Sequence, residues 1–160
     1  MSAAGNRELI ERFYAAFARR DGDAMAACYA ANARFRDPVF TLDGAHVGAM
    51  WRMLCSRGVD LRVECAGVEG DDAGGAARWQ AWYTFSTTGR AVHNVVHARF
   101  AIRDGRIVEH IDAFDFWRWA RQALGPAGLL LGWSPVLRAK VRRQAASALA
   151  RYEAGGEPRR

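Results

Sequence analysis

Residues 104–116 read DGRIVEHIDAFDF, and this stretch decides the fold. Asp104-Gly105 is a strong signal for a two-residue type I′ turn, because both central residues of that turn need a positive φ. The turn separates residues 91–103 from residues 106–116, and we predict that these two stretches form paired antiparallel strands.

Two more strands are expected before this hairpin. Residues 59–65 alternate between apolar and polar side chains, and the glycine- and aspartate-rich segment 70–75 is typical of a turn. A further strand over 76–86 follows, with Thr88-Gly89 as the connection to the next strand. Four consecutive strands joined by short turns indicate an antiparallel sheet.

Helices are expected before the strands. Leu9, Ile10, Phe13 and Phe17 recur at steps of three and four residues, which predicts a first helix with one apolar face. Asn6 is the expected N-cap of this helix.

The segment after the first helix is expected to break at Gly22, with a positive φ there. A short second helix would then carry Tyr29 on its inner face, followed by a strand over 33–37 and a third helix that ends at Gly58. Helices followed by consecutive hairpins predict an α+β domain with the helices on one face of a curled antiparallel sheet.

The C-terminal quarter carries the net positive charge. Residues 1–116 hold 14 arginines and 15 acidic residues, whereas residues 117–160 hold nine basic residues and two acidic ones. The basic residues are interpreted as the solvated face of an amphipathic helix, so no nucleic-acid partner is expected. Binding of nucleic acid or anionic lipid through residues 138–143 is the alternative.

Two helical segments are expected in this quarter. The first has Trp117 on its apolar side and stops at Gly125-Pro126. Ser134-Pro135 would open the last helix as N-cap and first helical residue, with Val136 on the inner face.

The composition is typical of one globular domain, with 51% hydrophobic and 25% charged residues in a chain of 160. No apolar run approaches the roughly 20 residues that span a bilayer. We therefore expect neither a membrane span nor a signal peptide, and a cytoplasmic location. Cys28, Cys55 and Cys65 lack the spacing of a metal site and are interpreted as small buried hydrophobes.

Three short motifs follow one another along the chain. They are FYAAF at 13–17 followed by DGD at 21–23, DGRIV at 104–108, and DAFD at 112–115. In this order they resemble the first helix, the last hairpin and the last-strand acidic signature of the nuclear transport factor 2-like superfamily. Within it, the chain is most similar to the SnoaL-like group of polyketide cyclases and ketosteroid isomerase-related proteins.

This resemblance implies a cone-shaped curved antiparallel sheet with N-terminal helices packed on the concave face, plus a C-terminal helical extension. We expect a SnoaL-like domain over residues 1–124 and an extension of the same domain over 125–160. The resemblance also implies a homodimer through the outer face of the sheet.

The same resemblance implies a small apolar, cyclic ligand inside the cone. A cofactor-free acid/base enzyme of the cyclase, isomerase or hydrolase type is one interpretation. A non-catalytic ligand-binding or protein-interaction module is the other, because the superfamily contains both. No cofactor is expected, since the sequence has no glycine-rich motif that would cradle a phosphate.

Candidate site residues follow from the strand geometry that the resemblance implies. Alternate residues of a strand share a face, so His110 and Asp112 would both point into the cone, with Asp37 at the end of the first short strand. These three are the candidate catalytic residues. The candidate ligand-binding residues are Tyr14, Phe35, Trp51, Asn94, Val96, Ala98 and Phe114.

Asp37-Pro38-Val39 is similar to the segment that carries the general base of ketosteroid isomerases. However, the oxyanion-hole tyrosine of those enzymes aligns with Phe13, and their second aspartate falls near Ala98. A developing enolate would lack its stabilising donors, so ketosteroid isomerisation by the known arrangement is not expected.

Asp112 resembles the last-strand aspartate that activates water in limonene epoxide hydrolases and that acts as acid/base in SnoaL-like cyclases. The hydrolases also have an Arg-x-Asp pair where this chain has Trp79, Ala81 and Tyr83. The cyclase interpretation accommodates this difference, because an intramolecular aldol closure needs mainly one acid/base group and a shape that folds the substrate.

The candidates also have structural interpretations. Asp37 can make a turn bond, His110 can be a hydrogen-bonded core histidine, and Asp115 would cap the following helix. His93 and His97 would be about 13 Å apart on a strand and could not chelate one ion. No metal site is therefore expected.

Overall fold

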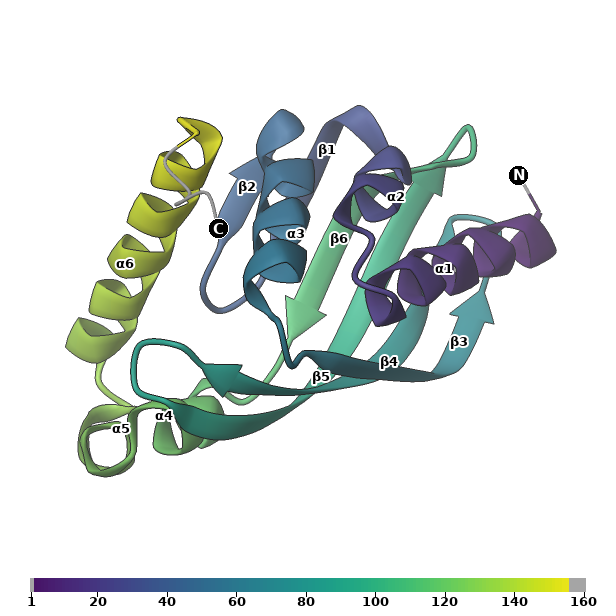
Figure 1. The fold of residues 1–160 in the computed structure, drawn as a ribbon. Helices are drawn as coiled ribbons and strands as arrows, with labels where there is room; N and C mark the ends of the chain where they lie inside the picture. The colour runs from purple at the N-terminus through teal and green to yellow at the C-terminus, as the bar shows by residue number, and fades with distance from the viewer. Residues whose placement is uncertain (1, 156–160) are drawn as a thin grey trace.

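In a computed structural model, which describes residues 2–155, the chain forms a curved six-stranded sheet with its N-terminal helices on the concave side (Figure 1). The helices are α1 Ala3–Ala18, α2 Gly22–Ala27, α3 Ala45–Arg57, α4 Phe116–Leu124, α5 Pro126–Leu131 and α6 Pro135–Glu153. The strands are β1 Tyr29–Arg36, β2 Thr41–Asp43, β3 Arg62–Gly70, β4 Gly74–Phe85, β5 Arg90–Arg103 and β6 Arg106–Ala113. The predicted α+β fold with a C-terminal helical extension is confirmed.

The strands follow the order β2-β1-β6-β5-β4-β3. Asp104 and Gly105 have φ values of 51° and 72°, as the predicted type I′ turn between β5 and β6 requires. The prediction of a fully antiparallel sheet is wrong at one pair, because β1 runs parallel to β6. These two strands are far apart in the chain, so no tight turn constrains their relative direction.

A β-bulge shifts the inner face of β6. Ala101 is opposite Glu109 but Ile102 is opposite Ile107, so Val108 is the extra residue. Ile107 is therefore buried together with His110 and Asp112.

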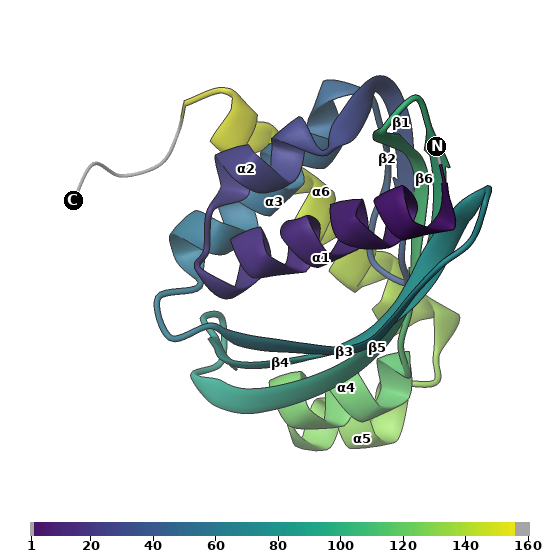
Figure 2. The same cartoon turned by 90° about the vertical axis from the view of Figure 1, so that its right-hand side faces the viewer.

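Helix α1 crosses the concave side of the sheet (Figure 2) and begins earlier than expected. Ser2 is its N-cap and accepts a hydrogen bond from the Gly5 N–H. Asn6 is buried within the helix, and its side-chain amide donates to the carbonyl oxygen of Asp71 at 2.8 Å. Asn6 thus fixes α1 to the β3–β4 turn instead of capping the helix.

The break between α1 and α2 also differs from the expectation. The positive φ belongs to Arg20, and Asp21 caps α2. Gly22 is needed for close packing, since a Cβ there would lie 2.6 Å from the Cα of Arg52. Tyr29 is not in α2 but is the first residue of β1, which places its side chain in the core.

Helix α4 follows β6 in the chain and lies along the part of β5 that β6 does not pair with. Asp115 caps it as predicted, accepting from the Arg118 N–H. The side-chain amide of Gln122 accepts a hydrogen bond from the N–H of His93 and donates one to its carbonyl oxygen. It thereby satisfies the backbone polar groups of His93 at the edge of β5. The ring of Trp119 is buried, whereas Trp117 is exposed, contrary to the expectation for its face.

Helix α6 lies beside α3 (Figure 1) and begins with Ser134 as N-cap and Pro135, as predicted. Val141 and Leu149 are buried, but Val136 is exposed and does not face the interior. Within the described residues, no helix combines the length and the apolar character needed to cross a membrane.

Candidate functional site

The inner face of β6 places two polar side chains in an apolar core. His110 is fully buried and Asp112 is 4% exposed. The rings of Phe13, Phe35 and Phe100 surround the imidazole, with centroid separations of 5.6, 5.0 and 4.2 Å. The strand alternation that predicted both residues as inward-facing is thereby confirmed.

A chain of hydrogen bonds runs through these residues. His110 Nε2 lies 2.8 Å from Asp112 Oδ1, and His110 Nδ1 lies 2.7 Å from Tyr29 Oη. Trp51 Nε1 donates to Tyr29 Oη at 2.9 Å. Residues from β1, α3 and β6 therefore form one buried polar chain, which we call the Trp51–Asp112 chain.

The proton positions in this chain follow from its first member. The indole N–H of Trp51 can only donate, so Tyr29 Oη accepts there. A buried hydroxyl proton without an acceptor is costly, and His110 Nδ1 is the acceptor within reach. Neutral His110 then carries its proton on Nε2 and donates it to the carboxylate of Asp112.

Asp37 lies beside Asp112. The last parallel pair of β1 and β6 is Arg36 with Ile111, so Asp37 comes one position further, next to Asp112. Its Oδ1 accepts hydrogen bonds from the N–H groups of Val39 and Phe40, at 2.7 and 2.6 Å. The predicted turn bond is present.

Burial raises the pKa of Asp37 to about 6, and the negative charge of Asp112 adds to this shift. The two backbone N–H donors act in the opposite direction but do not outweigh burial. The turn interpretation and the raised pKa therefore hold for the same side chain.

A second indole–phenol pair lies near Asp37. Trp119 Nε1 donates to Tyr83 Oη at 2.8 Å. Burial raises the pKa of Tyr83 to about 12, and the charge of Asp37 contributes to it. Helix α4, which lies within the expected 1–124 domain, thus adds Trp119 to the interior.

Two buried donors in the interior have no hydrogen-bond partner among the described residues. They are Tyr14 Oη and Trp79 Nε1, whose rings have centroids 6.2 Å apart. Burial raises the pKa of Tyr14 well above its ordinary value, with a further contribution from Asp112. Tyr14 also lines a surface hollow between α1 and β3, together with Arg7, Glu11 and Cys65.

The structure brings together the three candidate catalytic residues, but in a packed interior. Phe35, Trp51, Val96 and Ala98 are buried as expected, whereas Asn94 and Phe114 are only partly buried. Asp37, His110 and Asp112 do not line the surface hollow between α1 and β3, the hollow between α1, α2 and the β5–β6 turn, or the hollow beside α4.

Sequence reasoning missed Tyr29, Tyr83 and Trp119 as parts of the site. Tyr83 follows Trp79 and Ala81 at steps of two on the inner face of β4, and this alternation was the available signal. The sequence predicts Tyr29 on the inner face of a helix, whereas it lies on β1, which pairs with β6.

The model of the SnoaL-like domain family matches residues 10–110, so the chain belongs to this family. A comparison with curated proteins gave no match. Solved structures show the same fold. An LEH-like epoxide hydrolase from M. tuberculosis has 19% identity and a TM-score of 0.63, over 84% of this chain and 96% of that chain.

A putative polyketide cyclase from Silicibacter sp. has 19% identity and a TM-score of 0.61, over 77% of this chain and 98% of that chain. A putative ketosteroid isomerase from Kribbella flavida has 16% identity and a TM-score of 0.55, over 71% and 79%. The resemblance to the nuclear transport factor 2-like superfamily is confirmed at the level of the fold.

Proposed function

We propose that this protein binds a small apolar, cyclic carbonyl compound inside the cone and that Asp112 exchanges a proton with it without a cofactor. The observation that carries the proposal is the Trp51–Asp112 chain. An Asp–His pair in an apolar core costs desolvation energy that well-packed hydrophobic residues would avoid. Buried ionisable groups with aligned partners are characteristic of functional sites.

The hydrogen bonds of the Trp51–Asp112 chain orient Asp112 for proton transfer. The Nε2–H of His110 donates to Oδ1 and holds the carboxylate in one orientation. His110 is therefore a positioning residue, and Asp112 is the member that would touch the substrate.

Tyr14 and Trp79 are the residues proposed to bind the ligand. Their unpartnered donors would be satisfied by a carbonyl oxygen of the ligand. The hollow between α1 and β3 that Tyr14 lines would be the entry. Asp37, with its pKa raised to about 6, would hold or release a second proton near neutral pH.

The test is proton exchange on a bicyclic ketone. 2-Tetralone is incubated with the protein in D2O, and loss of its α-proton signal is followed by NMR. The wild-type protein is expected to accelerate the exchange, and Asp112→Asn to lower the acceleration about 100-fold or more. Asp71→Asn, which changes an exposed turn aspartate, is the matched control and keeps the full rate.

Tyr29→Phe tests the positioning role of the chain. Wild-type His110 is expected to show the neutral Nε2–H tautomer in its ¹⁵N chemical shifts, and Tyr29→Phe to change them because Nδ1 loses its donor. Tyr83→Phe removes the hydroxyl of the other indole–phenol pair and leaves the His110 shifts in place. A wild-type Nδ1–H tautomer would contradict the assigned direction.

A non-catalytic ligand-binding module is the second candidate, and the packed interior around His110 favours it. Tryptophan fluorescence with 2-tetralone separates the two. Binding without faster exchange would assign the protein to this class and remove the acid/base role of Asp112. If the protein neither bound 2-tetralone nor accelerated its proton exchange, the proposal of a carbonyl ligand would be contradicted.

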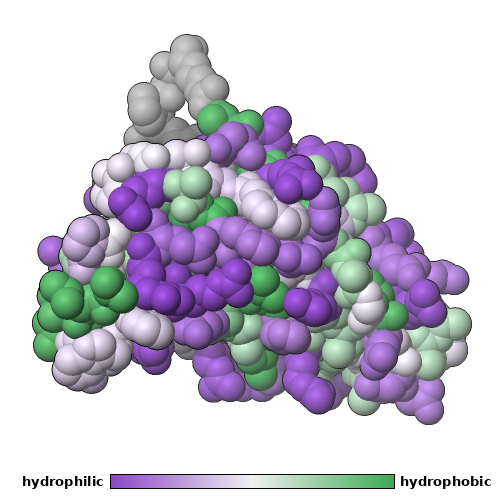
Figure 3. All heavy atoms as spheres, turned by 90° about the horizontal axis from the view of Figure 1, so that it is seen from below, coloured by the Kyte–Doolittle hydropathy of each residue, from purple (hydrophilic) through white to green (hydrophobic). Residues whose placement is uncertain are grey.

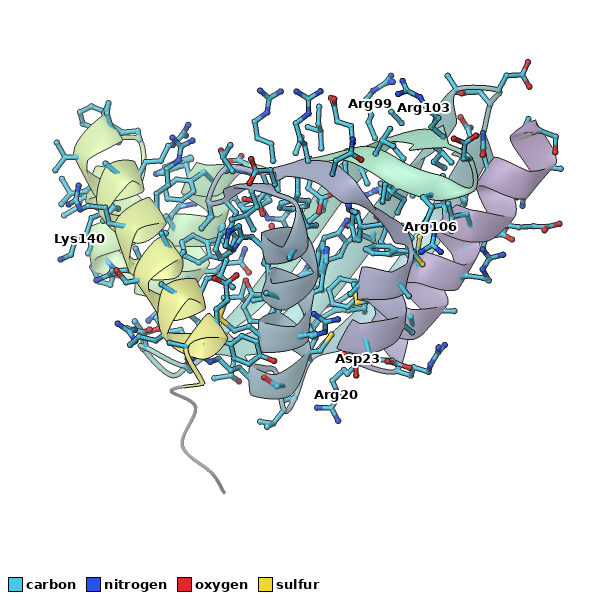
Figure 4. All side chains as sticks on the ribbon, turned by 90° about the horizontal axis from the view of Figure 1, so that it is seen from above. Arg20, Asp23, Arg99, Arg103, Arg106 and Lys140 are labelled. Atoms are coloured by element: carbon cyan, nitrogen blue, oxygen red, sulfur yellow. The ribbon has the colours of Figure 1, made fainter. Side chains whose placement is uncertain are left out.

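The homodimer through the outer face of the sheet stays a prediction. Arg99 and Arg103 point outward from β5 (Figure 4), so a symmetric contact on that face would have to separate or pair these charges.

A further inference from the structure

Helix α5 buries its glycine and exposes its leucines. Gly128 is buried, and a Cβ there would lie 1.8 Å from the carbonyl oxygen of Ala120, so the backbone of α5 packs directly on α4. Leu129, Leu130 and Leu131 are 51, 68 and 50% exposed. This is the reverse of the arrangement that would stabilise a helix on a soluble domain.

The exposed apolar surface extends beyond α5. Trp133 is 71% exposed and Val136 is 76% exposed, at the start of α6. Figure 3 shows a compact hydrophobic group at the left edge of the view, at the end of the molecule where α5 lies. We call the following residues the apolar patch: Trp117, Leu129, Leu130, Leu131, Trp133 and Val136.

Basic side chains lie next to the apolar patch. A surface hollow is lined by Arg90, Arg118, Arg121 and Gln122. The guanidinium group of Arg121 stacks on the ring of Trp117 at 4.3 Å, which joins the hollow to the patch.

The outer face of α6 continues this arrangement. Lys140 and Arg143 follow Val136 at steps of four and seven residues and therefore share its face. Lys140 points away from the body of the protein (Figure 4). All three residues are exposed.

These cations are not neutralised within the described chain. Among the described residues, no ion pair is formed by Arg90, Arg118, Arg121, Lys140 or Arg143. Glu153 is the acidic residue of α6, and it pairs with His46 at 2.6 Å. The face formed by α4, α5 and the outer side of α6 thus combines exposed leucine and tryptophan side chains with unpaired positive charge.

We propose that this face docks on the surface of an anionic phospholipid bilayer. The apolar patch would enter the interface between headgroups and acyl chains, and the basic residues would bind lipid phosphates. Tryptophan and leucine beside arginine and lysine are the residue types that favour such interfaces. The proposal is independent of the proton transfer proposed for Asp112.

Charge favours the bilayer over a second copy of this chain. A symmetric dimer through the apolar patch would bring two sets of unpaired cations face to face. An anionic surface neutralises them instead.

The experiment is co-sedimentation of the full chain with vesicles of pure phosphatidylcholine or of phosphatidylcholine mixed with phosphatidylglycerol. The protein is expected to bind the mixed vesicles at low salt about tenfold more tightly than the neutral ones, and to dissociate at high salt. Equal binding to both vesicles, or none to the mixed ones, would overturn the proposal.

Variants locate the surface. Leu130→Ser combined with Trp133→Ser is expected to lower binding about tenfold, because both side chains are exposed and would lose their insertion into the interface. Lys140→Gln combined with Arg143→Gln is expected to reduce the salt dependence. Val59→Ser, at an exposed valine outside the patch, is the matched control, and thermal melting verifies that all variants fold.

Two further outcomes would contradict the proposal. Unchanged vesicle binding by the Leu130/Trp133 variant would place the contact elsewhere on the chain. Concentration-dependent self-association that this variant abolishes, without vesicle binding, would assign the apolar patch to a second copy.

Discussion

Asp37 and Asp112 lie side by side but have different hydrogen-bond partners. Asp112 accepts from one imidazole N–H, whereas a single oxygen of Asp37 accepts from two backbone N–H groups. Backbone donors normally stabilise a carboxylate. At Asp37 burial outweighs them and raises the pKa to about 6, so the ionised form costs stability at neutral pH.

Asp37→Asn is expected to stabilise the protein at neutral and alkaline pH. The carboxyl group has a higher pKa when folded, so its contribution to wild-type stability is fully present below about pH 4 and is lost as the pH rises to about 6. Asparagine keeps the oxygen that accepts from Val39 and Phe40 but cannot ionise. Urea unfolding at about pH 8 should give a gain of about 1–3 kcal/mol, shrinking toward zero at about pH 4.

Asp71→Asn is the matched control for this change. Asp71 makes the same kind of turn, with one oxygen accepting from the N–H groups of Ala73 and Gly74, but it is exposed. Its variant should follow the wild-type pH dependence. A gain for Asp37→Asn that stays constant from pH 4 to pH 8 would show that packing, and not ionisation, causes it.

Among the elements, those fixed by local interactions were predictable. The β5–β6 hairpin follows from Asp104-Gly105, whose turn geometry depends on two residues. The sequence predicts the first strand from residue 33, but β1 begins at Tyr29, because its partner strand is remote in the chain. Tyr29 pairs with Ile107 across most of the chain, and this pairing overrides the helix propensity of the alanine-rich segment around it.

The candidate site also contains a part that local sequence patterns predict and a part that depends on remote pairing. Alternation along one strand was sufficient to place His110 and Asp112 together. Their partners Tyr29 and Trp51 come from β1 and α3, and no spacing in the sequence reports that β1 lies beside β6. The polar chain depends on tertiary packing, so the His110–Asp112 pair could be predicted, whereas the hydrogen bonds that join Tyr29 to His110 and Trp51 could not.

Gly128→Ala tests the packing of α5 on α4. Helix propensity alone would favour alanine by about 1 kcal/mol. The new Cβ would lie 1.8 Å from the backbone oxygen of Ala120, which cannot rotate away. We expect a net loss of about 1–3 kcal/mol, with faster amide exchange in α5 measured by mass spectrometry.

Leu130→Ala is the control for this element. It removes more atoms than Gly128→Ala adds, but from an exposed side chain, so stability should change by less than about 0.5 kcal/mol. If Gly128→Ala raised the melting temperature, α5 would be free to move off α4.

At the scale of the whole molecule, the family match ends at residue 110 but the hydrophobic core does not. Leu149 of α6 belongs to the main core, and Val141 packs in a second cluster with Val92 and Trp119. Arg142 Nε also donates to the carbonyl oxygen of Pro38 at 2.9 Å, next to Asp37. The helical extension therefore packs against the end of the cone that holds the candidate site.

Leu149→Ala measures whether the extension folds together with the SnoaL-like domain. If it does, removing this buried side chain costs about 2–5 kcal/mol and shifts a single unfolding transition. Val136→Ala on the same helix removes an exposed side chain and should change stability by less than about 0.5 kcal/mol. If α6 unfolded independently, Leu149→Ala would leave the main transition in place and reveal an earlier one, and the proposed boundary at residue 125 would separate two folding units. The burial of Leu149 among core residues favours the single transition, so the described part of the extension would belong to the same cooperative unit as the candidate site.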